Sequence, residues 1–114
     1  MKARLKWIES FCFMGEAESG HAVLIDGDKK RGVSPMELIL LGTAGCTSYD
    51  VISILQKARQ DVRDVQVEIT AERAERDPKV YTHIHFHFIV TGQQVGAEHV
   101  RRALKLSAEK YCSA

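Results

Sequence analysis

A long helix signal, which begins at Ser34, constrains the fold of this chain more than any other feature. Ser34 can cap a helix, Pro35 suits the first helical position, and Glu37 completes a capping box. The helix can continue to about Arg59, which makes it roughly 26 residues or 39 Å long at 1.5 Å per residue. In a chain of 114 residues, a helix of this length is expected to be the central core element.

The middle of this helix is built from very small residues, which run from Gly42 to Gly45 and lead to Cys46. Glycine in a helix interior costs on the order of 1 kcal/mol relative to alanine, so two glycines beside a cysteine need a reason. Either another backbone approaches closely, or the space admits a small substrate at the sulfur. After Asp50 an apolar stripe at helical spacing continues the helix.

The residues before the helix predict three short strands. Residues 2–8 alternate between apolar and basic side chains, which is typical of a half-buried strand. Shorter strand candidates cover residues 11–14 and 21–25, and glycines separate them, so an antiparallel meander is expected. The composition of residues 26–32 is that of a loop.

The residues after the helix predict a hairpin and a second helix. Residues 62–71 and 80–90 alternate as two strands joined by a turn that contains Pro78, and residues 98–111 carry a helical apolar stripe. The order is therefore β-β-β-α-β-β-α, an α+β fold with a largely antiparallel sheet. No linker divides the chain, which predicts a single domain over residues 1–114.

Composition excludes several classes of partner. The formal net charge is +1, and basic residues are scattered among acidic ones, so neither nucleic acid nor a membrane is expected as a partner. No signal peptide is visible, and the apolar stretch from Leu38 to Cys46 is too short to span a bilayer. The three cysteines fit no zinc spacing, and a reducing cytoplasm is the expected compartment.

Thiol chemistry is the main catalytic possibility. Cys46 is either a small buried hydrophobe or a nucleophile, and Cys112 is either a resolving thiol or incidental. Cys12, between two phenylalanines on a strand, is interpreted as structural. A thiolate that attacks a peroxide becomes a sulfenic acid, which a second cysteine converts to a disulfide. Whether Cys46 and Cys112 meet is left open by the sequence.

Three histidines share one face of the strand over residues 80–90, namely His83, His85 and His87. Successive rings lie about 6.5–7 Å apart along a strand, so that neighbours could ligate a metal. A complete site would need another ligand, and the sequence offers no obvious one. The simpler interpretation is a solvent-facing row, so no metal and no cofactor are expected.

Several segments together resemble the OsmC/Ohr family (osmotically inducible protein C and organic hydroperoxide resistance protein), and its YhfA-like branch in particular. They are the helix start Ser34-Pro35-Met36-Glu37, the run Gly42-Thr43-Ala44-Gly45-Cys46, the strand Thr82-His83-Ile84-His85-Phe86-His87-Phe88 and the tail Lys110-Tyr111-Cys112-Ser113. The resemblance covers nearly the whole chain and keeps the order of elements.

This resemblance implies a fold and an activity. Family members are thiol-dependent peroxidases that act on organic hydroperoxides, and they form intertwined homodimers in which sheets wrap long central helices. By position, Cys46 matches the peroxidatic cysteine and Cys112 the resolving one. Family members also use a glutamate and an arginine to activate the thiolate. Glu37 falls one position from that glutamate, and its alternative role is the capping box.

The chain departs from the family in two ways. No arginine matches the family position, which leaves Arg31 in the loop and Arg4 on the first strand as candidates. Family chains also continue past the second cysteine into another helix and a strand, whereas this sequence ends at Ala114. We therefore expect either a shortened chain or a partner subunit that covers the core.

The expected function is reduction of organic hydroperoxides to alcohols in the cytoplasm, with a dithiol as reductant. The catalytic candidates are Cys46, Cys112, Glu37 and Arg31. The apolar helix face near Cys46 favours alkyl or fatty-acid hydroperoxides over hydrogen peroxide. The alternative is a non-catalytic dimer of the same fold that binds a small molecule or senses redox state.

Overall fold

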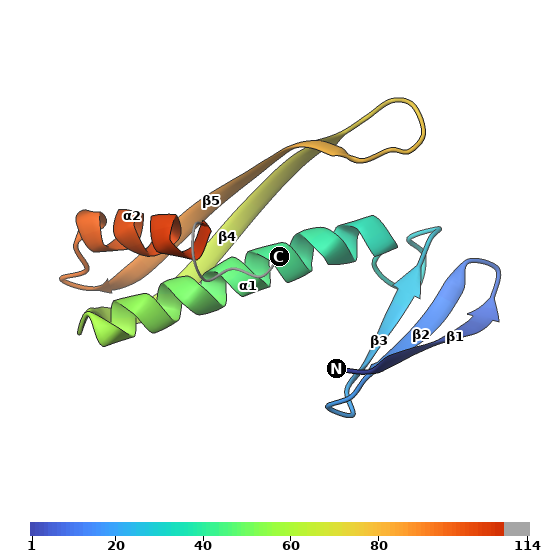
Figure 1. The fold of residues 1–114 in the computed structure, drawn as a ribbon, viewed down its shortest axis with the longest axis horizontal. Helices are drawn as coiled ribbons and strands as arrows, with labels where there is room; N and C mark the ends of the chain where they lie inside the picture. The colour runs from blue at the N-terminus through green and yellow to red at the C-terminus, as the bar shows by residue number, and fades with distance from the viewer. Residues whose placement is uncertain (109–114) are drawn as a thin grey trace. The chain divides into compact units, whose positions relative to one another are not determined.

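The structure, a computed structural model, describes residues 1–108. Seven elements follow one another in the predicted order (Figure 1). They are β1 (Ala3–Glu9), β2 (Cys12–Ala17), β3 (Ala22–Asp26), α1 (Pro35–Lys57), β4 (Asp61–Arg73), β5 (Tyr81–Gln93) and α2 (Ala97–Leu106). The chain forms two compact units, Met1–Leu41 and Gly42–Ala114, so that the division falls inside α1.

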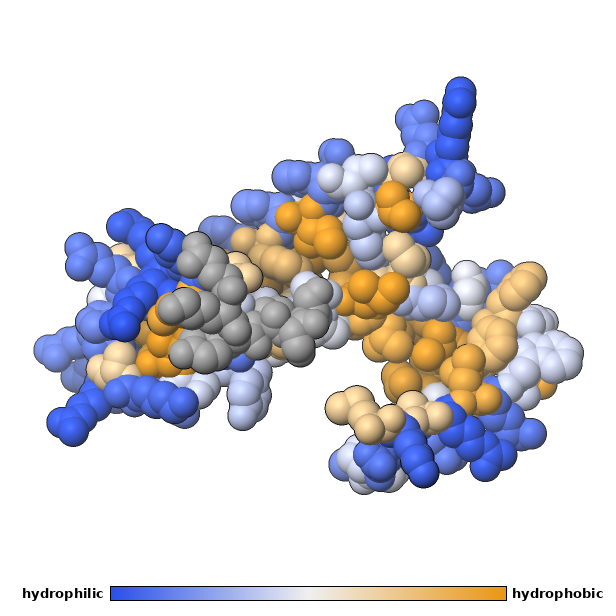
Figure 2. Space-filling view, in the orientation of Figure 1, coloured by the Kyte–Doolittle hydropathy of each residue, from blue (hydrophilic) through white to orange (hydrophobic). Residues whose placement is uncertain are grey.

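The first unit contains the predicted antiparallel meander, with strand order β1-β2-β3. The expectation of a half-buried first strand is wrong for the described chain, because every residue of β1 is exposed. Leu5 and Trp7 are 59% and 63% exposed, and Figure 2 shows apolar residues gathered on the surface of this sheet. The alternation is present in β1, but no described element covers its apolar side.

The loop after β3 is organised by Asp26, which is only 4% exposed. Its carboxylate accepts hydrogen bonds from the backbone N–H groups of Asp28, at 2.8 Å, and of Arg31, at 3.0 Å. The Asp28 hydrogen bond is the main cause that lowers the pKa of Asp26 below its ordinary value of 3.8. Its own backbone N–H donates to the carbonyl oxygen of Val33, which brings the chain back towards the start of α1.

Acid should weaken this loop through Asp26. Because the pKa of Asp26 is lower in the folded chain, its contribution to stability is complete above pH 3.8 and is lost as the pH falls further. Asp26→Asn should therefore be less stable than the parent chain at pH 7, and the difference should narrow below about pH 4. Urea unfolding followed by circular dichroism at several pH values measures this difference, and a gap that stays constant with pH would contradict the role of the carboxylate.

Helix α1 begins with the predicted capping box. The backbone N–H of Glu37 donates to Ser34 Oγ at 3.2 Å, and the backbone N–H of Ser34 donates to Glu37 Oε1 at 2.9 Å. The reciprocal bond from the Ser34 backbone is the main cause that lowers the pKa of Glu37. Two N–H groups that would lack partners at the helix start are thereby satisfied.

Ser34→Ala should destabilise the chain by about 1 kcal/mol, since alanine offers no oxygen to the Glu37 backbone N–H. Thermal unfolding of this variant and of Ser34→Asp measures the effect, because aspartate restores a capping oxygen. Equal losses of stability in both variants would show that the cap is not the cause.

The second unit packs part of α1 and α2 against the antiparallel hairpin β4–β5. Residues on β4 alternate between half-buried and exposed, as predicted. The core consists of Val51, Leu55 and Ala103, each fully buried. Partly buried apolar side chains complete it, namely Ile54, Val62, Phe88, Val90, Val100 and Leu104.

Two details hold the second unit together, one within the hairpin and one between the helices. At Gly92, near the end of β5, a Cβ atom would lie 1.9 Å from the carbonyl oxygen of Asp61, so only glycine lets the strands approach here. At the other end of α2, the fully buried Ser107 donates from Oγ to Asp50 Oδ2 at 2.8 Å. The described helix is Ala97–Leu106, continued by a π-type turn at residues 107–108, and the rest of the predicted helix lies outside the described residues.

Helix α1 is more extensively apolar than the short run inferred from the sequence. By length and composition alone, Pro35–Lys57 is long and apolar enough to cross a membrane. Core helices of soluble proteins meet the same criterion, and Val51 and Leu55 on this helix are fully buried. Length and apolar composition therefore do not by themselves assign α1 to a membrane.

Candidate functional site

Cys46 lies on α1 at the edge of a face made of small residues. A helix advances 100° per residue, so Gly42, Gly45 and Cys46 project within a common sector. The buried residues of the same helix, Ala44, Val51 and Leu55, occupy the opposite side. Cys46 is half-buried, although it projects on the same side of the helix as the two exposed glycines.

The open side has room beside the thiol. Gly42 and Gly45 are both exposed, and a Cβ atom at either position would have no neighbouring atom within 4 Å. The sequence suggested two reasons for these glycines. The first, close approach of another backbone, is absent within the described chain. The second reason, space for a small molecule next to the sulfur, is compatible with this geometry.

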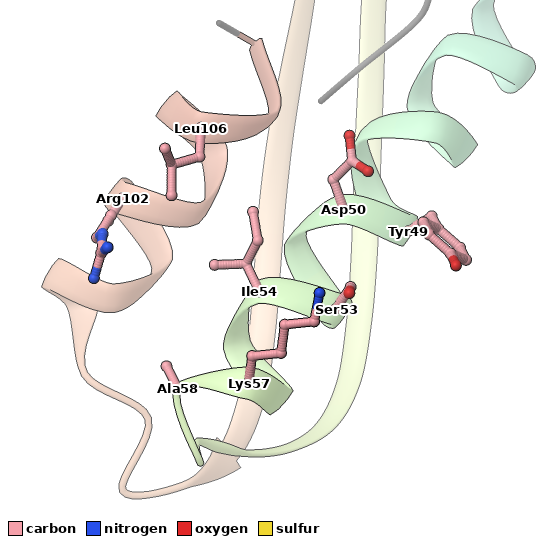
Figure 3. Close-up of a pocket in the computed structure, with 8 residues that line it drawn as sticks. All are labelled: Tyr49, Asp50, Ser53, Ile54, Lys57, Ala58, Arg102 and Leu106. Atoms are coloured by element: carbon pink, nitrogen blue, oxygen red, sulfur yellow. The ribbon is translucent and has the colours of Figure 1, made fainter. Parts of the chain in front are cut away.

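A groove between α1 and α2 begins one helical turn beyond Cys46 (Figure 3). Its volume is about 490 Å³, and Ile54, Ala58 and Leu106 supply apolar lining. Lys57 and Arg102 add two positive charges to its lining. Figure 3 shows Ile54 and Leu106 in the space between the helices, whereas Tyr49 points to the side of α1 away from α2.

Asp50 is the polar residue of this groove that links the two helices. It accepts the 2.8 Å hydrogen bond from the buried hydroxyl of Ser107, which ties the two helices together. This pair was not predicted from the sequence, although Ser107 lies within residues 98–111, where a second helix with an apolar stripe was expected. A buried hydroxyl requires a hydrogen-bond partner, and that requirement was the signal available.

The two predicted activating residues have other partners within the first unit. The guanidinium of Arg31 forms an ion pair with the Glu9 carboxylate, and this hydrogen bond is the main cause that raises the pKa of Arg31. The carboxylate of Glu37 receives the Ser34 backbone N–H in the capping box. Arg4 lies on β1 and is exposed.

Of the other two cysteines, only Cys12 lies within the described residues. Cys12, on β2, is 2% exposed, in agreement with its structural interpretation. Cys112 lies outside the described residues, so its approach to Cys46 stays a prediction. Within residues 1–108, no three side chains of histidine, cysteine, aspartate or glutamate are gathered around a common metal position.

Comparison with known proteins agrees with this fold. The family model described as OsmC-like protein matches residues 27–114. The chain is 53% identical over 114 residues to protein YhfA of Escherichia coli strain K12, a match that covers 99% of this chain and 85% of the relative.

Solved structures extend the comparison. A hypothetical protein from Aquifex aeolicus VF5 has a TM-score of 0.89 at 32% identity, with 98% of this chain and 81% of that chain covered. The organic hydroperoxide resistance protein OhrB of Bacillus subtilis has a TM-score of 0.60 at 12% identity, with 99% and 87% covered, which shows a shared fold. The family match over most of the sequence and the close relative together establish that this chain belongs to the OsmC family.

Proposed function

We propose that the chain is a thiol-dependent peroxidase that reduces organic hydroperoxides, with Cys46 as the attacking residue. The observation that carries the proposal is the half-buried position of Cys46 beside two glycines that leave open space. Membership of the OsmC family supports it, because the fold of a hydroperoxide resistance protein is the same.

The proposed reaction has three balanced steps. The Cys46 thiolate attacks one peroxide oxygen, the O–O bond breaks, and the other oxygen leaves as an alkoxide that takes a proton to become the alcohol. The resulting sulfenic acid condenses with the thiol of Cys112, which forms a disulfide and releases water. An external dithiol then reduces the disulfide by thiol–disulfide exchange.

A homodimer is part of this proposal. Large apolar side chains are exposed in the described chain, among them Trp7 and Phe11 in the first unit and Tyr49 on α1. Large exposed apolar side chains are characteristic of interaction sites when they gather in a patch, and a second copy of the chain would cover those of each unit. A cytoplasmic location, where dithiol reductants are abundant, fits the same cycle.

Ionisation of the Cys46 thiol requires a nearby cation or hydrogen-bond donors. Arg31 and Glu37 are the candidates that the family resemblance supplies, and both are already held by neighbours in the first unit. If Arg31 serves Cys46, it must exchange or share its contact with Glu9. Loss of activity in Arg31→Lys, which keeps the charge but lacks the planar guanidinium, would point to this role.

A second candidate function is binding of a small molecule without turnover. The groove of about 490 Å³ between α1 and α2 favours it, because its apolar lining and the positive charges of Lys57 and Arg102 would suit an amphipathic anion. In this case the thiols would not be consumed by peroxide.

Titration of the reduced chain with cumene hydroperoxide, while free thiols are counted, tests the proposal. A peroxidase that uses Cys46 and Cys112 loses two thiols per chain, and mass spectrometry of the digested product locates the link. An unchanged thiol count in a chain shown by circular dichroism to be folded would favour the binding function instead.

A further inference from the structure

The exposed face of the hairpin β4–β5 carries a row of histidine and glutamate side chains that the proposed peroxidase cycle does not use. The three histidines on β5 pair with residues of β4 in antiparallel register. These pairs are His87 with Glu68, His85 with Thr70, and His83 with Glu72. The glutamates supply the further ligand that the strand sequence around the histidines does not contain.

All six side chains lie on one face because successive residues of a strand point to opposite sides. His83, His85 and His87 are exposed, as are Glu68 and Glu72. Between them, half-buried residues such as Val67, Ile69 and Phe86 turn to the other side of the sheet. The ligand-bearing face is therefore the solvent face of the hairpin in the described chain.

The five ionisable side chains of this row are not engaged with other side chains within residues 1–108. None of them forms an ion pair or a side-chain hydrogen bond with another described residue. No three of these donors are already gathered around one point, so a chelate must form by rotation of exposed side chains about χ1 and χ2. Such rotation is inexpensive for side chains that are not packed against neighbours.

The spacing of these residues along and across the two strands suits a metal ion held by two imidazoles and one carboxylate. Neighbouring histidines on one strand face are about 6.5–7 Å apart at Cα, and a directly opposed pair on two strands is closer still. His85 and His87 with Glu68 make one such set, and His85 and His83 with Glu72 make another. Two histidines, a glutamate and water form a ligand set that zinc accepts in tetrahedral sites.

We propose that the solvent face of β4–β5 binds one zinc ion, or a related divalent transition-metal ion, through His85, one neighbouring histidine and the glutamate opposite that neighbour. His85 belongs to both sets, so it is the residue on which the site depends. Water completes the coordination shell. The proposal is independent of the peroxidase activity, because Cys46 lies on α1 and contributes no ligand.

Zinc titration of the untagged, reduced chain tests the site, with backbone amide signals observed by nuclear magnetic resonance. Zinc should shift the amides around residues 68–72 and 83–87. His85→Asn should remove these shifts and weaken zinc binding at this face at least about tenfold, equivalent to about 1.4 kcal/mol. Acidification should release the metal as well, since protons compete for the imidazole nitrogens.

His99→Asn is the matched control, because His99 is an exposed histidine on α2. It should bind zinc as the parent chain does, and all variants keep the same three cysteines, so binding by thiols is equal in each. The double variant Glu68→Gln, Glu72→Gln should also weaken binding if carboxylates complete the site. Zinc binding at this face that survives His85→Asn, or amide shifts confined to other elements, would overturn the proposal.

Discussion

Replacement of Cys46 by serine should abolish the hydroperoxide-dependent loss of thiols. A serine hydroxyl is not ionised at neutral pH and cannot form a sulfenic acid, so the first step of the proposed cycle has no nucleophile. We expect the rate of hydroperoxide reduction to fall at least about a thousandfold, since removal of a catalytic nucleophile is among the largest single effects in enzymes. Stopped-flow measurement of cumene hydroperoxide consumption with excess dithiol gives this rate.

Cys12→Ala is the control for this experiment. Cys12 is 2% exposed on β2, and we expect its replacement to leave the rate nearly unchanged. Cys112→Ser should still consume one equivalent of hydroperoxide and should then accumulate sulfenic acid at Cys46, which dimedone traps. A rate that is equal in Cys46→Ser and the parent chain would rule out Cys46 as the nucleophile.

The largest effect on stability is expected from Leu55→Ala. Leu55 is fully buried and lies in the core between α1, the hairpin β4–β5 and α2. Truncation of a buried leucine removes apolar contacts and leaves a cavity, which together cost about 3 kcal/mol. Because natural domains are stable by only about 5–15 kcal/mol, urea unfolding should show a clearly lower midpoint.

An exposed aliphatic residue of the same unit provides the comparison. Val80 is 53% exposed, so Val80→Ala should change the free energy of unfolding by no more than about 0.5 kcal/mol. Comparable losses in the two variants would mean that the described core of the second unit is not the main source of its stability. An unchanged urea midpoint in Leu55→Ala would lead to the same conclusion.

Local sequence signals predicted the elements well. The capping box at Ser34 and Glu37 needs only residues that lie within four positions, and both of its hydrogen bonds are present. The alternation in β4 is equally local, because each residue depends only on its place along the strand. Burial of β1 failed as a prediction because it depends on what covers the strand, and the described chain covers none of its residues.

The candidate site could be predicted only in part. Cys46 was identifiable because glycines beside a thiol are unusual in a helix, and the structure places it at the edge of an open face. The pairing of Arg31 with Glu9 was not predictable, since the two residues are far apart in sequence and come together through the loop that Asp26 organises. The link between Cys46 and Cys112 stays a prediction.

The sequence by itself determined the order of strands and helices, the start of α1 and the position of the thiol, because helical and strand periodicity and capping are settled within a few residues. Only the tertiary structure decided that Ser107 bonds Asp50 across 57 positions, and that glutamates of β4 stand opposite histidines of β5. The physical reason is that such partners are chosen by the path of the whole chain and by strand register, which short-range patterns do not contain.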